Sequence, residues 1–181
     1  MGYYVFVDNS NVWIEGRYAS AVHQGWVGNM YEAHRKNAQD ASWRIDFGRL
    51  LNFVSEGNID DVKKAVLIGS KPPRSDSLWN AMKKANFEVS ILDRNVVNKE
   101  KAIDTSIVIA IDKCLYREAK PEDKFILIMG DRDFVPSIQT IHEEGLAVKL
   151  VFWSNASGEL IAEADDFVNL DEHIDSISFR V

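Results

Sequence analysis

Residues 126–134 of this 181-residue chain read ILIMGDRDF, an apolar run that ends abruptly at two aspartates one residue apart. The apolar part has the length and composition of a buried strand. Asp131 lies at the mouth of that strand, where an acid is costly unless it is hydrogen-bonded, paired or bound to a metal. The segment therefore predicts a buried strand whose end is a candidate metal site.

The same pattern occurs near the N-terminus, where the apolar run Tyr3–Val7 leads directly into Asp8. In an open parallel sheet, ligands bind beyond the carboxyl ends of the strands, so acids that are distant in sequence can meet there. We therefore expect Asp8 and Asp131 at one edge of a common sheet.

Apolar runs of strand length alternate with helix-length segments along most of the chain, which favours a mostly parallel sheet built from βαβ units. The fold class is predicted as α/β, with five to six strands. The expected strands are Tyr3–Val7, Lys64–Ile68, Phe87–Leu92, Lys124–Ile128, Ala147–Phe152 and Phe167–Leu170. The expected helices are Val12–Val22, Phe47–Glu56, Ser77–Ala85, Ala102–Glu118, Phe134–Glu144 and Gly158–Ala164.

The length fits a single domain over residues 1–181. Residues 24–43 are polar and aromatic without a clear period, and the segment is too long for an ordinary connection. We expect an insert here, either a functional lid or an addition to the domain.

The composition, with 46% hydrophobic and 27% charged residues, is typical of a soluble globular protein. No apolar run approaches the ~20 residues of a membrane span, and the N-terminal residues do not resemble a secretory signal. The single cysteine, Cys114, excludes an intrachain disulfide and a cysteine zinc cluster. These features predict a cytoplasmic protein with no membrane partner.

The formal net charge of −7 has the wrong sign for a protein that holds nucleic acid mainly through a basic surface. Either the partner is not a polyanion, or the acids gather where cations mask them.

Four aspartates are candidates for an acidic cluster that cations could neutralise. They are Asp8, Asp104 in the first turn of an expected helix, Asp131 and Asp133. Like charges crowded at one end of a sheet are strained unless divalent cations neutralise them. Hard ions such as Mg²⁺ prefer oxygen ligands, and Asn11 can orient a water beside Asp8. Ions held in this way favour hydrolysis of a phosphodiester.

Each of these residues also has a purely structural interpretation. Asp133 can cap the following helix, Asp104 can compensate a helix dipole, and Asp8 can serve as a turn aspartate. Ser10 or Asn11 can cap the helix that follows Asp8.

Three motifs, FVDNSN at 6–11, KAID at 101–104 and GDRDFVP at 130–136, together resemble the NYN family of the PIN-like nuclease superfamily. They occur in the family's order, and the resemblance covers Tyr3 to Leu170. Met129 departs from the pattern, because the family often has a small hydroxyl residue before the Gly-Asp pair.

The resemblance implies a three-layer α/β/α sandwich with a metal-dependent ribonuclease site that uses Mg²⁺ or Mn²⁺. By this resemblance, Asp8, Asp104 and Asp131 are the main ligands, and Asp133 is a further or water-mediated ligand. Asn11 is then an orienting side chain in the catalytic set.

RNA is the expected partner, held by basic loops on the same rim as the acids. The predicted substrate-binding residues are Ser10, Ser70, Lys71, Arg74, Arg94 and Lys101. The alternative is that the cations are ordinary solvated loop charges, or that Lys101 pairs with an acid.

Residues 24–43 also combine the cations of 34–36 with Trp26, Tyr31 and Trp43, a mixture that stacks bases of single strands. The alternative is that these aromatics pack against the domain or against a second copy in a homo-oligomer.

Two other functions compete with a nuclease. A haloacid-dehalogenase-like phosphohydrolase also begins with an aspartate after a strand, but it needs a second acid where this chain has Ser10. A PIN-like module that binds RNA or protein without cutting is the non-enzymatic alternative.

Overall fold

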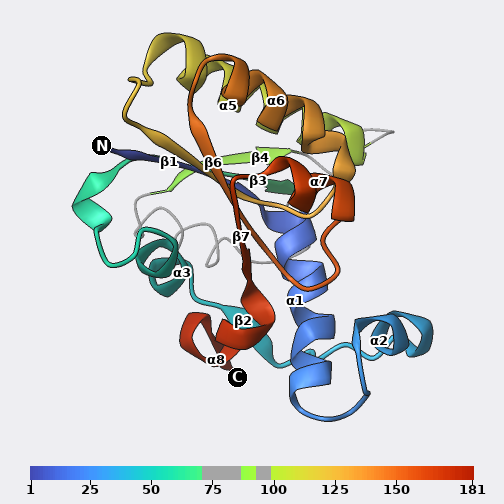
Figure 1. Ribbon diagram of the computed structural model, residues 1–181. Coiled ribbons are helices and arrows are strands. Elements are labelled where there is room, and N and C mark those ends of the chain that lie inside the picture. The colour runs from blue at the N-terminus through green and yellow to red at the C-terminus, as the bar shows by residue number, and fades with distance from the viewer. Residues whose placement is uncertain (71–86, 93–98) are drawn as a thin grey trace.

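The computed structural model describes residues 1–70, 87–92 and 99–181 of the chain (Figure 1). Within these residues the main sheet has six strands in the order β4-β3-β1-β5-β6-β7, and every neighbouring pair is parallel. The strands are β1 (Tyr3–Asp8), β3 (Val62–Ser70), β4 (Glu88–Leu92), β5 (Lys124–Ile128), β6 (Ala147–Phe152) and β7 (Asp166–Asn169). The six predicted strands are therefore confirmed, with small shifts at their ends.

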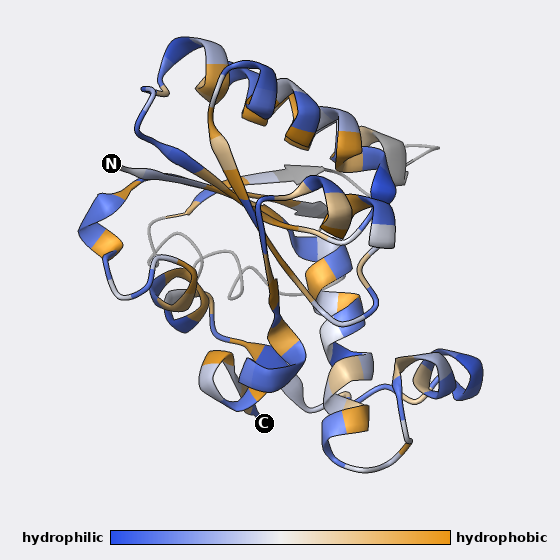
Figure 2. Ribbon diagram, in the orientation of Figure 1, coloured by the Kyte–Doolittle hydropathy of each residue, from blue (hydrophilic) through white to orange (hydrophobic). Residues whose placement is uncertain are grey.

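The sheet is covered on both faces because its central strands are apolar on both. Val5 and Val7 of β1 join one hydrophobic core, whereas Tyr4 and Phe6 join the other. A parallel sheet buried on both sides reads as a continuous apolar run, which explains the form of these segments in the sequence. Figure 2 shows orange, hydrophobic stretches where the strands cross at the centre of the sheet.

Helices form the outer layers of a three-layer α/β/α sandwich, as expected. They are α1 (Asn9–His23), α2 (Met30–Lys36), α3 (Phe47–Val54), α5 (Lys99–Arg117), α6 (Val135–Glu143), α7 (Gly158–Glu163) and α8 (Ile174–Ile177). In Figure 1, α5, α6 and α7 lie on one face of the sheet, and α1 and α3 lie on the other. The expected helix Ser77–Ala85 lies outside the described residues. None of the described helices is long and apolar enough to cross a membrane.

The strand order places a topological switch point between β1 and β5. From β1 the chain proceeds to β3 and β4 on one side, then returns to build β5, β6 and β7 on the other. Ligands of open α/β sheets bind at the carboxyl ends of the strands at this point. Asp8 ends β1 and Asp131 follows β5, so both lie at this edge.

Residues 24–43, which the sequence analysis describes as lacking a clear period, contain α2 and the start of β2 (Trp43–Ile45). The strand β2 pairs antiparallel with β8 (Ser178–Arg180), a second small sheet that the sequence analysis misses. Its strands are only three residues long, too short to show a period.

Asp40 ties this region to α1 and to the last strand. Its carboxylate accepts hydrogen bonds from Ser20 Oγ at 2.6 Å, Ser42 Oγ at 2.6 Å and Arg180 Nε at 3.1 Å. Burial alone would raise the pKa of Asp40, but these hydrogen bonds outweigh it and lower the pKa to about 2. The carboxylate is therefore held charged in the interior.

Candidate functional site

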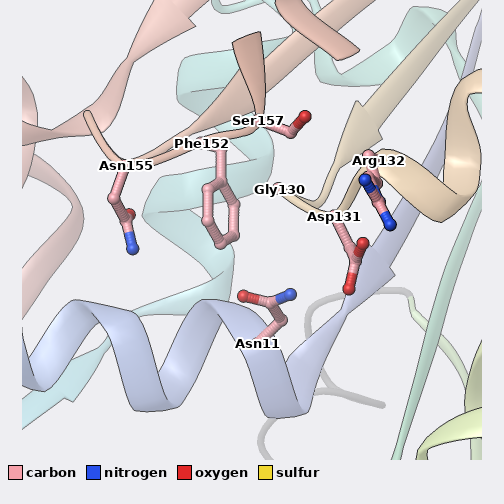
Figure 3. Close-up of a pocket in the computed structure, with 7 residues that line it drawn as sticks. All are labelled: Asn11, Gly130, Asp131, Arg132, Phe152, Asn155 and Ser157. Carbon is pink, nitrogen blue, oxygen red and sulfur yellow. The ribbon is translucent and has the colours of Figure 1, made fainter. Parts of the chain in front are cut away.

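An open cleft of about 310 Å³ lies at the switch point (Figure 3). Its lining comes from residues at or just after the carboxyl ends of three strands: β1, β5 and β6. The lining residues are Asn11, Gly130, Asp131, Arg132, Phe152, Asn155 and Ser157. The cleft therefore lies where ligands of open parallel sheets usually bind.

Asp8 is the N-cap of α1, because its Oδ1 accepts the backbone N–H of Asn11 at 3.2 Å. This hydrogen bond places the carboxylate at the start of the helix, and the side chain of Asn11 lies one turn onward, in the cleft. The alternative in which Ser10 or Asn11 caps this helix is therefore wrong: Asp8 itself fills that role, and Ser10 lies in the first turn of α1.

The charge on Asp8 is disfavoured in the folded protein. Burial, with only 5% of the residue exposed, raises the pKa of Asp8 to about 6, and the negative charges of Asp104 and Asp131 add to this effect. The hydrogen bond from the Asn11 N–H opposes it. Three acids far apart in the sequence are thus close enough to interact electrostatically.

Asp131 is exposed at the end of β5, and its Oδ1 accepts the backbone N–H of Asp133 at 3.1 Å. Asp131 therefore caps the short 3₁₀ helix Arg132–Phe134, the kind of role that the structural alternative assigned to Asp133. Asp133 is exposed and does not line the cleft. Asp8, Asp104 and Asp131 interact electrostatically, and Asp133 adjoins them through its backbone N–H.

The predicted substrate-binding residues are described only in part. Ser70 is the last residue of β3 and lies at the same edge of the sheet, since β3 pairs with β1 up to Asp8. Lys101 lies in the first turn of α5, one turn before Asp104. Lys71, Arg74 and Arg94 lie outside the described residues.

Arg132, Asn155 and Ser157 line the cleft but were not predicted from the sequence. Arg132 lies between the two aspartates of the GDRDF motif and is exposed at the rim. Asn155 and Ser157 follow β6, one strand beyond β5. The reasoning applied to β1 and β5 applies equally to β6, so the polar residues after Phe152 were the signal that could have found them.

The aromatic residues of the 24–43 segment differ in their exposure to solvent. Trp43 is fully buried and packs edge-on against Trp153, so for Trp43 the alternative of packing against the domain is confirmed and base stacking is not. Trp26 and Tyr31 are 57% and 78% exposed. A residue that fills the core cannot also present its face to a ligand.

Three acids near the switch point are candidate ligands for a hard divalent cation. Asp8, Asp104 and Asp131 supply carboxylate oxygens, and Asn11 adds an amide in the cleft. In the part of the chain that the structure describes, no three His, Cys, Asp or Glu side chains are close enough together to form a complete metal-binding group. Mg²⁺ suits an incomplete set, because it usually keeps several waters and binds one or two carboxylates.

Comparisons with known proteins place the chain in a family. The NYN domain family matches residues 3–171, nearly the whole chain. No curated protein sequence shows a significant match. A crystal structure of a protein of unknown function from Vibrio parahaemolyticus superposes with a TM-score of 0.68 at 19% identity, covering 98% of this chain and 96% of that one. That likeness shows the same fold. The chain therefore belongs to the NYN domain family, one of the PIN-like nuclease families.

Proposed function

We propose that this protein is a metal-dependent ribonuclease that hydrolyses RNA phosphodiester bonds with Mg²⁺ or Mn²⁺. One observation carries the proposal: Asp8, Asp104 and Asp131, from three separate segments, converge at the switch point of the sheet beside an open cleft. A buried carboxylate whose charge is opposed by two others is a typical feature of a functional site. Membership of a PIN-like nuclease family supports the same function.

The residues of the chain have distinct roles in this proposal. Asp8 is oriented by the backbone N–H of Asn11, so its carboxylate is held in place before any ligand binds. Asp104 and Asp131 complete the negative charge that attracts a cation. A bound divalent ion supplies charge neutralisation at the phosphate and lowers the pKa of water.

Arg132 gives this acidic site a cation of its own. It follows Asp131 directly, lines the cleft and is exposed. A guanidinium matches the geometry of a phosphate. Arg132 is thus placed to hold an RNA phosphate at the rim, although the net charge of the protein is negative.

The test combines thermal unfolding with a cleavage assay. We expect millimolar Mn²⁺ to raise the melting temperature of the wild type and to support cleavage of a pool of single-stranded and structured RNA. Both effects should be lost in Asp131→Asn. The matched control is Asp60→Asn, an exposed aspartate just before β3, at the opposite end of the sheet. Full cleavage by Asp131→Asn would refute the metal site.

A second candidate function is a binding module that does not cut. It is favoured by the lack of a complete three-residue metal-binding group among the described residues. RNA binding that is equally strong in EDTA, with no shortening of the RNA in Mn²⁺, would support this function over the nuclease.

A further inference from the structure

Asn155 is the cleft residue whose side chain is most clearly held in place by other residues. It lies in the loop between β6 and α7, on the wall of the cleft that does not carry the acids (Figure 3). Its Nδ2 donates a hydrogen bond to Glu15 Oε2 at 2.6 Å. In Figure 3 the amide nitrogen points toward α1, which carries Glu15.

Glu15 is held in turn from the 24–43 segment. His34 Nε2, on α2, lies 2.7 Å from the same Oε2. The His34 ring is tilted against Tyr18 with ring centroids 4.0 Å apart, and the Tyr18 hydroxyl donates to Asn37 Oδ1 at 2.8 Å. Hydrogen bonds therefore connect α2 to the cleft through Glu15.

The loop that carries Asn155 is fixed independently of this connection. The Ser157 N–H donates to the Gly130 carbonyl at 2.9 Å, and the Ser154 N–H donates to Asp171 Oδ1 at 3.1 Å. Trp153 is fully buried and donates its Nε1–H to the Val12 carbonyl at 3.1 Å. Glu15 thus determines the orientation of one side chain rather than the course of the loop.

This orientation has a chemical consequence. Because the carboxylate of Glu15 only accepts hydrogen bonds, the amide of Asn155 must turn its nitrogen toward Glu15. The other end of the amide, Oδ1, has no hydrogen bond within residues 1–70, 87–92 and 99–181. It is an acceptor that can serve a neutral donor on a ligand in the cleft.

We propose that Asn155 Oδ1 accepts a hydrogen bond from a nucleotide of the RNA, either from a ribose 2′-OH or from a base N–H. In this proposal the 24–43 segment, through His34, helps to hold Glu15, and Glu15 in turn orients the amide of Asn155. Glu15 and His34 are therefore positioning residues that act through Asn155. The inference rests on the proposed function, because it names a contact within the same cleft.

The test uses the full chain and 5′-labelled single-stranded RNA. Dissociation constants are measured by anisotropy in EDTA, so that nothing is cut, and kcat and KM are measured in Mn²⁺. We expect Asn155→Ala to raise both Kd and KM by about 5- to 10-fold, the loss of one hydrogen bond, with kcat within about 2-fold of wild type. Asn155 is exposed, so this change should leave the melting temperature unchanged.

The positioning role is tested by coupling between variants. Glu15→Ala should raise KM about as much as Asn155→Ala, and it should add nothing in the Asn155→Ala background. Glu15→Gln keeps an acceptor for Asn155 and should restore most of the affinity. His34→Phe keeps the ring beside Tyr18 but removes the hydrogen bond, so it should have a smaller effect. The control is Gln139→Ala, which breaks an amide–carboxylate contact with Glu163 between α6 and α7, away from the cleft.

The outcomes separate this inference from the proposed function. If the wild type neither binds nor cuts any RNA of a pool of single-stranded and structured molecules, both are overturned. Cleavage by wild type with unchanged Kd and KM in Asn155→Ala would overturn the inference alone. Substrates with a 2′-deoxy sugar at each position then identify the donor: a deoxy penalty that disappears in Asn155→Ala assigns the contact to the ribose, and one that persists assigns it to the base.

Discussion

Gly130 and Phe152 are in such close contact that a Cβ added to Gly130 would lie 2.1 Å from Phe152 Cε1. The ring is 1% exposed and lines the cleft between β5 and β6. The glycine of the GDRDF motif is therefore required by packing, because any side chain would occupy the space of the ring.

We predict that Gly130→Ala lowers the free energy of unfolding by about 2 kcal/mol, because the added Cβ overlaps the ring and forces it out of its packed position. Urea denaturation measures this change. Gly158→Ala is the matched control: no atom lies within 4 Å of its added Cβ, and it should be neutral or slightly stabilising. Equal stability of the two variants would contradict the packing argument.

Asp8→Asn should stabilise the protein in EDTA while abolishing cleavage. The folded pKa of about 6 lies above the ordinary value of 3.8, so the folded state binds this proton more tightly than the unfolded chain does. The resulting destabilisation appears as the pH rises from about 4 to about 6 and is complete above that range, at up to about 3 kcal/mol. Asparagine still caps α1, so the helix start is preserved. The control is Asp46→Asn, which alters the N-cap of α3. A loss of stability in Asp8→Asn at pH 7 would refute this prediction.

The stability that Asp40 contributes should depend on pH in the opposite direction to that of Asp8. The folded pKa of Asp40, about 2, lies below the ordinary 3.8, so its contribution is fully present above pH ~4 and is lost as the pH falls toward 2. The contribution is on the order of 2 kcal/mol. Chemical denaturation at pH 5, 4, 3 and 2.5 should show a smaller acid-induced decrease in Asp40→Asn than in wild type. Parallel curves for the two proteins would count against the assigned pKa.

Asp123→Ala should be among the most destabilising changes at the amino end of the sheet. The buried carboxylate accepts the Gly2 N–H at 2.8 Å, the Lys120 N–H at 2.9 Å and Lys63 Nζ at 2.6 Å. Without the carboxylate, these donors are left unpaired in a partly buried position. We therefore expect urea denaturation to show a loss of about 3 kcal/mol in the free energy of unfolding.

The control for this prediction is Glu118→Ala, which removes an exposed ion pair with Lys64 at 3.0 Å. An exposed pair contributes little, so the change should stay below about 1 kcal/mol. If the two variants lost similar stability, the burial of Asp123 would not be the deciding factor.

The local pattern of apolar residues was sufficient to predict most strands of the sheet. The expected strands Lys124–Ile128 and Ala147–Phe152 coincide with β5 and β6, because each is a mostly apolar and largely buried run of strand length. The weak elements escaped detection: β8 has three residues and α8 has four, too few to show a period.

Some residues of the candidate site could likewise be predicted from the sequence, and others could not. Asp8 and Asp131 were identifiable because each is an acid at the end of an apolar run, whereas Asn155, at the same distance from its strand as Asp131, is a neutral amide and gives no charge signal. The structural roles were also misassigned locally, since the caps belong to Asp8 and Asp131 rather than to Ser10, Asn11 or Asp133. Capping depends on the local turn geometry, and the sequence shows only that several polar residues are available.

The sequence by itself determined which segments are buried strands and that acids follow two of them, because burial and strand polarity are properties of short stretches of chain. Parallel strands share a carboxyl edge, so this knowledge also located the site. Only the tertiary structure decided that β6 adds a third wall and that Asn155 meets Glu15, 140 residues away. Such contacts depend on the lateral order of the strands and on the packing of helices against them, which arise from many long-range interactions at once.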